Sequence, residues 1–198
     1  MAWDTEGTKR KIVDAATAQF ALTGPAGTTI ERIAKEAGVN KERVYAYYGG
    51  KDALFAHVLA EQMRTATASV PVPSTGPDDV AAYAGRLFDY LDQHPHLLRL
   101  LQWEALTITG GVPDEQHRRE MYAERTGELA QGQATGNLTS SFDADLLNVL
   151  ILGVVGYWTM VPQVARMIAG PSDGPHEKER RRAAVVEAAR RLATPLPA

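Results

Sequence analysis

Apolar residues recur three and four positions apart along most of the chain, and proline and glycine fall between these runs. No stretch keeps the alternation of apolar and polar residues that marks a half-buried strand. The pattern therefore predicts an all-α protein of about nine helices. Their expected ranges are 8–23, 28–38, 40–48, 51–69, 79–93, 95–109, 113–133, 143–168 and 175–193.

Two short helices are expected on either side of Gly38, a residue suited to the left-handed turn that ends a helix. The first would begin with a capping box of Thr28 and Glu31, and the second would be capped by Asn40. Such a pair is typical of a helix-turn-helix, whose second helix enters the DNA major groove, but it also fits an ordinary helical hairpin. The outward side chains of the second helix are long or hydrogen-bonding: Lys41, Glu42, Arg43, Tyr45 and Tyr47.

The stretch from Leu146 to Pro162 is apolar around the whole circumference of its expected helix. Asn148 and Thr159 interrupt it, and it is shorter than the roughly 20 residues that span a membrane. Such a helix must be covered on two sides, by the core of its own subunit or by another subunit. We expect it to form a dimer interface with the last helix. The residues expected there are Leu147, Ile151, Val154, Val155, Trp158, Val185, Ala189 and Leu192.

The composition of the 198-residue chain, 44% hydrophobic and 23% charged, is that of a globular protein with a sizeable core. The absence of cysteine excludes disulfides, a thiolate nucleophile and cysteine-ligated zinc. A net charge of -3 gives no bulk attraction to nucleic acid, although residues 1–57, with eight basic and seven acidic side chains, are the less acidic part. Charged residues follow Met1 without the apolar core of a secretory signal, so we expect a cytoplasmic protein.

The residues around the two short helices resemble the N-terminal domain of TetR-type transcriptional repressors. The resemblance covers the first quarter to third of the chain. Gly49 and Gly50 depart from it, because a polar cap usually precedes the following helix. The segments that carry the resemblance are Thr28–Lys41 (TTIERIAKEAGVNK), Val44–Tyr48 (VYAYY) and Lys51–Phe55 (KDALF).

This resemblance implies a ligand-responsive DNA-binding regulator, a repressor that a small hydrophobic effector releases from a palindromic operator. Residues 1–50 would form a three-helix DNA-binding domain, and residues 51–198 the effector-binding and dimerisation domain. A homodimer is expected because one short helix contacts too few bases to specify a site. The resemblance implies base contacts for Lys41 and Arg43, and phosphate contacts for Thr28, Thr29, Tyr45, Tyr47 and Lys51.

An effector pocket would be lined by the middle helices, mainly by apolar side chains with a few polar groups. Glu104 and His117 are candidates for those polar groups, and each apolar residue is equally a candidate for plain core. The expected lining residues are Tyr83, Leu87, Phe88, Leu91, Leu100, Trp103, Glu104, Leu106, Met121, Tyr122 and Trp158.

Two other functions fit the sequence less well. An all-helical enzyme would need catalytic apparatus, but there is no P-loop, dinucleotide fingerprint or nucleophile elbow, and the histidines have no metal-ligand spacing. We therefore expect no enzyme activity, cofactor or metal. A DNA-binding regulator controlled by a protein partner, without an effector, stays open. The sequence does not identify the effector, the operator or the regulated genes, nor whether the outcome is repression or activation.

Overall fold

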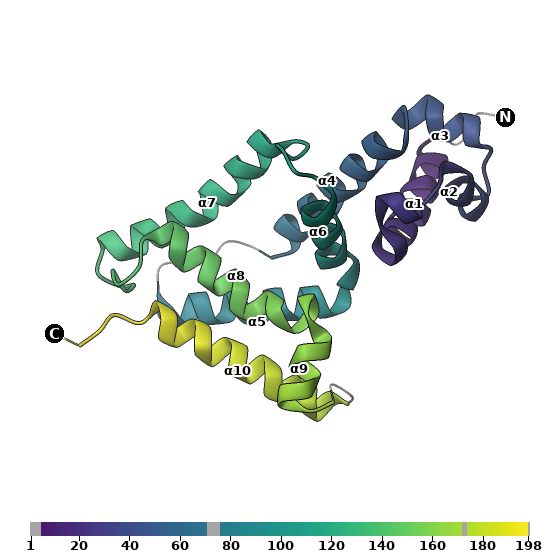
Figure 1. Ribbon diagram of the computed structural model, residues 1–198. Helices are drawn as coiled ribbons and strands as arrows, with labels where there is room; N and C mark the ends of the chain where they lie inside the picture. Colours follow the sequence, from purple (N-terminus) through teal and green to yellow (C-terminus); the bar gives the residue numbers. More distant parts are fainter. Residues whose placement is uncertain (1–4, 71–75, 172–173, 198) are drawn as a thin grey trace. The chain divides into compact units, whose positions relative to one another are not determined.

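The computed structural model describes residues 5–70, 76–171 and 174–197, and within these it consists of ten α-helices joined by turns and loops (Figure 1). Contacts divide the chain into two compact units. The first contains the described residues up to Thr65 together with His96–Glu115, and the second contains those of Ala66–Pro95 and Gln116–Ala198. This division does not coincide with the domain boundary expected at residue 50, which stays a prediction.

The first unit holds the N-terminal helices and α6. Its helices are α1 (Thr5–Gly27), α2 (Ile30–Ala37), α3 (Lys41–Tyr48), most of α4 (Lys51–Ser69) and α6 (Pro95–Thr107). Helix α2 packs against both α1 and α3. The Phe20 ring of α1 meets the Phe55 ring of α4 edge-on at 5.2 Å between centroids. Ile12, Ile33 and Val44 are fully buried, so the apolar spacing of the sequence does form one core.

A kink at Gly24 interrupts α1 and receives an aromatic ring from α6. Gly24 has φ 70° and ψ 174°, a conformation essentially confined to glycine. A Cβ at this position would lie 2.6 Å from Cδ2 of Trp103. The Trp103 indole N–H donates to the Ala21 carbonyl at 3.4 Å. Glycine is therefore required here by backbone geometry and by the close approach of the indole. The expected helix break at Gly24 is seen, although a helical turn continues to Gly27.

The second unit is built around α5, which packs on α8 and α10. Its helices are α5 (Pro77–Gln93), α7 (Glu115–Ala134), α8 (Ala144–Met160), α9 (Pro162–Ala169) and α10 (Pro175–Ala193). Basic residues of α10 pair with acidic residues of α5: Arg182 with Asp89 at 2.8 Å, Lys178 with Asp92 at 2.6 Å and Arg190 with Asp78 at 2.8 Å.

The prediction of one long helix over residues 143–168 is wrong. Pro162 has no N–H to donate and takes the first position of a new helix, so α8 ends at Met160 and α9 leaves at 88°. In the part of the chain that the structure describes, no single helix has the length and apolar content to cross a membrane, and α8 with α9 meets that test only as a bent pair. The ranges expected for α3, α4 and α10 are confirmed to within a residue.

Candidate nucleic-acid interface

Helices α2 and α3 form a helix-turn-helix with both N-termini capped by side chains. Thr29 Oγ1 accepts a hydrogen bond from the Arg32 N–H at 3.2 Å, and Asn40 Oδ1 accepts one from the Arg43 N–H at 3.2 Å. Between them Gly38 ends α2 in the left-handed conformation, with φ 67° and ψ 34°. The expected turn at Gly38 and the cap at Asn40 are therefore confirmed.

The capping role expected for Thr28 is wrong. Its hydroxyl donates to the Gln19 carbonyl at 3.2 Å and lies 2.8 Å from the Thr23 hydroxyl, while Thr29 takes the N-cap position. Thr28 is only 1% exposed, because it joins the start of α2 to the end of α1. Its side chain is directed into the protein.

One side of α3 anchors the helix and the other lies open. Val44 is fully buried, whereas Tyr45 is 48% exposed and Lys41 and Glu42 are exposed as well. Lys41 Nζ lies 3.6 Å from Glu31 Oε1. A backbone hydrogen bond to the Glu31 carboxylate, and then Lys41, lower the pKa of Glu31. The open side thus presents donors and acceptors at the spacing of one helix face.

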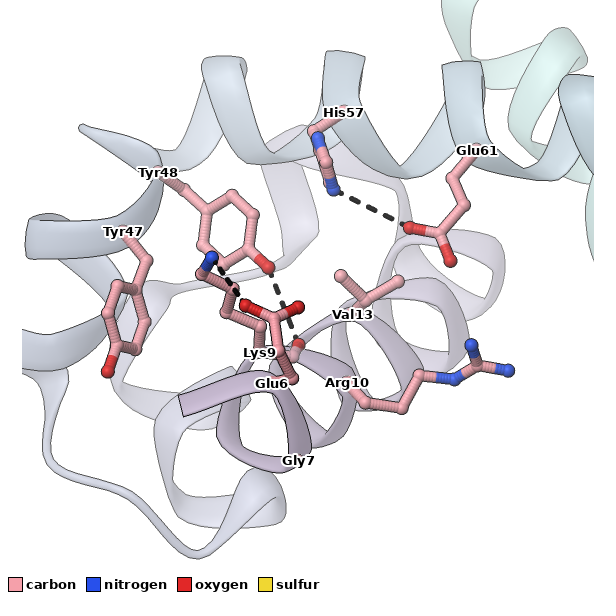
Figure 2. A pocket seen from close by; sticks show the side chains of 9 residues that line it. All are labelled: Glu6, Gly7, Lys9, Arg10, Val13, Tyr47, Tyr48, His57 and Glu61. Atoms are coloured by element: carbon pink, nitrogen blue, oxygen red, sulfur yellow. Dashed lines mark hydrogen bonds and ion pairs between the residues drawn. The ribbon is translucent and has the colours of Figure 1, made fainter. Parts of the chain in front are cut away.

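The end of α3 meets α1 and α4 at an open cleft of about 680 Å³ (Figure 2). The Tyr48 hydroxyl donates to the Lys9 carbonyl of α1 at 3.4 Å, and Lys9 Nζ lies 5.9 Å from the centroid of the Tyr47 ring. His57 of α4 lies beside Tyr48, with 5.0 Å between ring centroids, and 3.5 Å from the Glu61 carboxylate. Burial, and then Glu61, raise the pKa of Tyr48. The cleft is lined by Glu6, Gly7, Lys9, Arg10, Val13, Tyr47, Tyr48, His57 and Glu61.

Two glycines separate α3 from α4. Gly49 ends α3 in the left-handed conformation with φ 76°, and the Gly50 carbonyl accepts from the Leu54 N–H at 3.0 Å. Gly50 therefore occupies the N-cap position of α4 without a side-chain acceptor. Lys51 follows as the first residue of α4 and is half-exposed.

All eight residues expected at DNA lie in the first unit, at the starts of α2 and α4 and along α3. Thr28 alone among them is buried. Lys9, which lies over the Tyr47 ring from the first turns of α1, was not predicted from the sequence. The signal that could have found it is the basic run from Lys9 to Lys11.

The residues expected around an effector fall into both units. Leu100, Trp103, Glu104 and Leu106 belong to the first unit, where Leu106 is 75% exposed and Trp103 packs on Gly24. His117 is exposed and lies 3.9 Å from Glu120. Seven expected lining residues belong to the second unit: Tyr83, Leu87, Phe88, Leu91, Met121, Tyr122 and Trp158.

An apolar groove of about 650 Å³ runs between α8 and α10 in the second unit. Part of the interface expected here is corrected, because Leu147, Ile151, Val155 and Ala189 are at most 1% exposed and fill the core of their own subunit. Val185 is also buried and forms part of the groove floor, and Leu192 is half-buried on α10 outside the groove lining. The groove is lined by Val149, Leu150, Gly153, Val154, Tyr157, Trp158, Ala184, Val185 and Ala188.

The helix-turn-helix with an open second helix places this chain among helix-turn-helix DNA-binding proteins. Residues 12–58 match the family model of bacterial regulatory proteins of the tetR family, and residues 79–191 match that of the tetracyclin repressor-like C-terminal domain. The chain belongs to the TetR family and is a DNA-binding transcriptional regulator.

Relatives extend the likeness over nearly the full chain. The HTH-type transcriptional repressor SCO4008 of Streptomyces coelicolor is 43% identical over 173 residues, covering 87% of this chain and 88% of the relative. The crystal structure of the transcriptional regulator SCO4942 from Streptomyces coelicolor superposes with a TM-score of 0.81 at 32% identity, covering 94% and 98% of the two chains. FadR of Bacillus subtilis shares the fold, with a TM-score of 0.69 at 20% identity over 91% and 97%.

Proposed function

We propose that the protein is a homodimeric repressor that binds a palindromic operator and leaves it when a small hydrophobic effector binds. The open side of α3 carries this proposal. Lys41 and Arg43 are assigned to base edges, with Glu42 beside them on the helix. Phosphates are assigned to Thr29 at the start of α2 and to a second set of side chains: Lys9, Tyr45, Tyr47 and Lys51.

The groove between α8 and α10 supports the dimer. Val149 is 65% exposed and Tyr157 47% exposed, on the side of α8 opposite the buried Leu147 and Ile151. Gly153 lies on that same side, with nothing within 4 Å of the place where a Cβ would stand. An open apolar face with a small residue at its centre is suited to close packing against the same helices of a second copy.

The proposal of a small hydrophobic effector is supported by the family and by one protein of similar structure. The Bacillus subtilis FadR structure was determined in complex with stearoyl-CoA, so that protein of the same fold holds a ligand with a long apolar chain. In this chain the second unit offers buried aromatic and aliphatic side chains on α5, among them Tyr83, Leu87 and Phe88. We assign the effector to this unit.

DNA binding is tested with two substitutions that separate base contacts from phosphate contacts. Operator fragments are first selected from a random pool by the wild-type protein. Arg43→Ala is expected to cost about 1–3 kcal/mol and to relax the preference at one base pair per half-site. Lys51→Ala is expected to weaken binding to all DNA sequences by the same factor. It should also reduce the salt dependence of the affinity by about one released counterion per subunit.

Arg191→Ala is the control for these variants, because it removes one positive charge from a 79% exposed side chain of α10. It should leave both the affinity and its salt dependence unchanged. Unchanged DNA binding in both Arg43→Ala and Lys51→Ala would refute the assignment of α3 and the start of α4.

The dimer is tested by Val149→Glu, which places a charge in the groove. Sedimentation should show a dimer for the wild type and a monomer for the variant at micromolar concentration. Leu22→Glu, at a 62% exposed position of α1, is the control and should remain dimeric. A monomeric wild type, or a dimer that Val149→Glu leaves intact, would contradict the interface.

A further inference from the structure

Arg125 is a buried cation without a counter-charge. It is 8% exposed on α7, in the second unit. Its Nε is buried and has no hydrogen-bond partner, and the guanidinium forms no ion pair with any residue that the structure describes. An arginine keeps its charge at any accessible pH, so burial without a partner costs the folded protein several kcal/mol in order of magnitude.

The other buried arginine, Arg181, is paired within the fold. Arg181 of α10 is 7% exposed, but its Nε donates to the Glu177 carboxylate at 2.9 Å and its guanidinium donates to the Gly170 carbonyl at 2.8 Å. The same guanidinium lies 5.2 Å from the centroid of the Trp158 ring. Arg181 therefore has both a counter-charge and hydrogen-bond acceptors within the fold. The lack of such partners is specific to Arg125.

A second buried polar group without a partner lies beside Arg125, on α5. The guanidinium carbon lies 5.9 Å from the centroid of the Tyr83 ring of α5, and the Tyr83 hydroxyl is itself buried without a hydrogen-bond partner. Asn148 of α8 is 6% exposed and donates its amide N–H to Thr126, the neighbour of Arg125, at 3.2 Å. Helices α7 and α5 thus bring a guanidinium and a phenol to one buried place.

The local charge is positive. Burial raises the pKa of the Tyr83 hydroxyl, while Arg125 and Arg86 act to lower it, and the remaining group that acts on it is the Tyr122 phenol. No carboxylate of the described residues contributes. An anion brought to this place would therefore meet the Arg125 guanidinium and the Tyr83 hydroxyl, while Arg86, exposed on α5, adds only a more distant positive charge.

The surroundings of these polar groups are apolar. On α7, Tyr122 and Leu129 share the Arg125 face at three- and four-residue spacing, and Leu129 is 1% exposed. On α5, Leu87 follows Tyr83 by one turn and is also buried. A planar guanidinium binds a carboxylate or phosphate with two parallel hydrogen bonds, and the apolar side chains beside it favour a ligand with an apolar body behind that group.

From this arrangement we infer that the effector is an amphiphilic acid whose carboxylate or phosphate group pairs with Arg125 and accepts a hydrogen bond from Tyr83. The inference rests on the proposed function, since it names the chemical class of the effector. It also gives a reason for the unpaired arginine: the cost of burying the charge in the ligand-free protein is recovered only when the anion is bound.

The first test needs no ligand. Replacing Arg125 by Met keeps much of the side-chain volume and removes the charge, so the melting temperature of the ligand-free protein should rise. Arg181→Met is the matched comparison and should lower it, because Glu177 loses a partner. A clear fall in the melting temperature of Arg125→Met would show that the arginine stabilises the fold by itself, and would overturn the inference.

The second test uses three probes with the same ten-carbon chain below their micelle-forming concentrations: decanoate, decyl phosphate and decyltrimethylammonium. At least one of the two anions should raise the melting temperature of the wild type, and the cation should not. Arg125→Met should weaken anion binding roughly 10- to 150-fold, the range for one charge-assisted hydrogen-bonded pair. Arg86→Gln, which removes an exposed positive charge from α5, should change it less than about threefold.

Operator binding, measured alongside, separates this inference from the proposed function. Two results would refute the acidic effector and leave the proposed regulator intact. In both, the protein binds its selected operator. Either the cationic probe raises the melting temperature, or the anions bind equally well to the wild type and to Arg125→Met. The acidic effector is also refuted, with the proposed regulator intact, if the protein binds the operator and neither anion binds to the protein. If no operator is selected at all, the proposed function fails, whatever the probes do.

Discussion

The contact between Gly24 and Trp103 makes a strong prediction about stability in the first unit. Gly24→Ala adds a methyl group in a backbone conformation that essentially only glycine adopts, at a cost of about 1–3 kcal/mol. The new Cβ would also stand 2.6 Å from the indole of Trp103, and overpacking of this kind costs about another 1–3 kcal/mol. The gain from a stiffer unfolded chain recovers only about 0.4–1 kcal/mol. We expect a net loss of about 3 kcal/mol.

Denaturant unfolding followed by circular dichroism measures this loss, and Gly38→Ala provides the matched control. Gly38 is also left-handed, with φ 67°, but a Cβ there would have no atom within 4 Å, so the cost should be only about 1 kcal/mol. Measured in a Trp103→Ala background, Gly24→Ala should cost only the backbone part, because the steric part is then absent. A loss from Gly24→Ala no larger than that from Gly38→Ala would refute the proposed clash with the indole.

Three further predictions follow from the contacts of the helix ends. Gly50→Ser should stabilise the start of α4 by a few tenths of a kcal/mol, since a Cβ there has open space and the hydroxyl can cap the helix; a loss of helix stability on denaturation would contradict this. Arg180 and Arg181 hold the pKa of Glu177 at about 2, below its usual 4.5. The stability from this carboxylate is thus present above about pH 4.5 and lost as the pH falls towards 2, and Glu177→Gln should flatten the measured pH dependence in that window. Lys9→Ala should weaken DNA binding alike for all sequences and lower its salt slope, whereas an unchanged slope would remove Lys9 from the interface.

Local signals in the sequence were enough to predict the two short helices and the turn between them, and the family resemblance distinguished a helix-turn-helix from an ordinary hairpin. Gly38 and Asn40 act through neighbouring backbone groups, so residue type alone indicates the turn and the cap. The choice between Thr28 and Thr29 was missed because it depends on α1: the Gln19 carbonyl and the Thr23 hydroxyl bind the first threonine and leave the second to cap α2.

The C-terminal half was predicted less completely. The apolar character of α8 indicated that two of its sides would be covered, but only the packing of α5 and α10 shows that Leu147 and Ile151 face inward and Val149 outward. A proline within a helical pattern, here Pro162, signals a break, but the apolar run on both sides of it favours one continuous helix. Arg125 could not have been singled out, because its burial depends on packing between helices and it is one of several charged residues on α7.

The central claim of the proposed function is that the DNA-binding domains of two identical subunits bind a symmetric site. Selection of bound duplexes from a random pool, followed by sedimentation of the selected complex, tests this directly. We predict an inverted repeat whose half-site centres are one helical turn, about 34 Å, or a multiple of it apart, with subunits bound in pairs. A selected sequence without two-fold symmetry, bound by a single subunit, would contradict it.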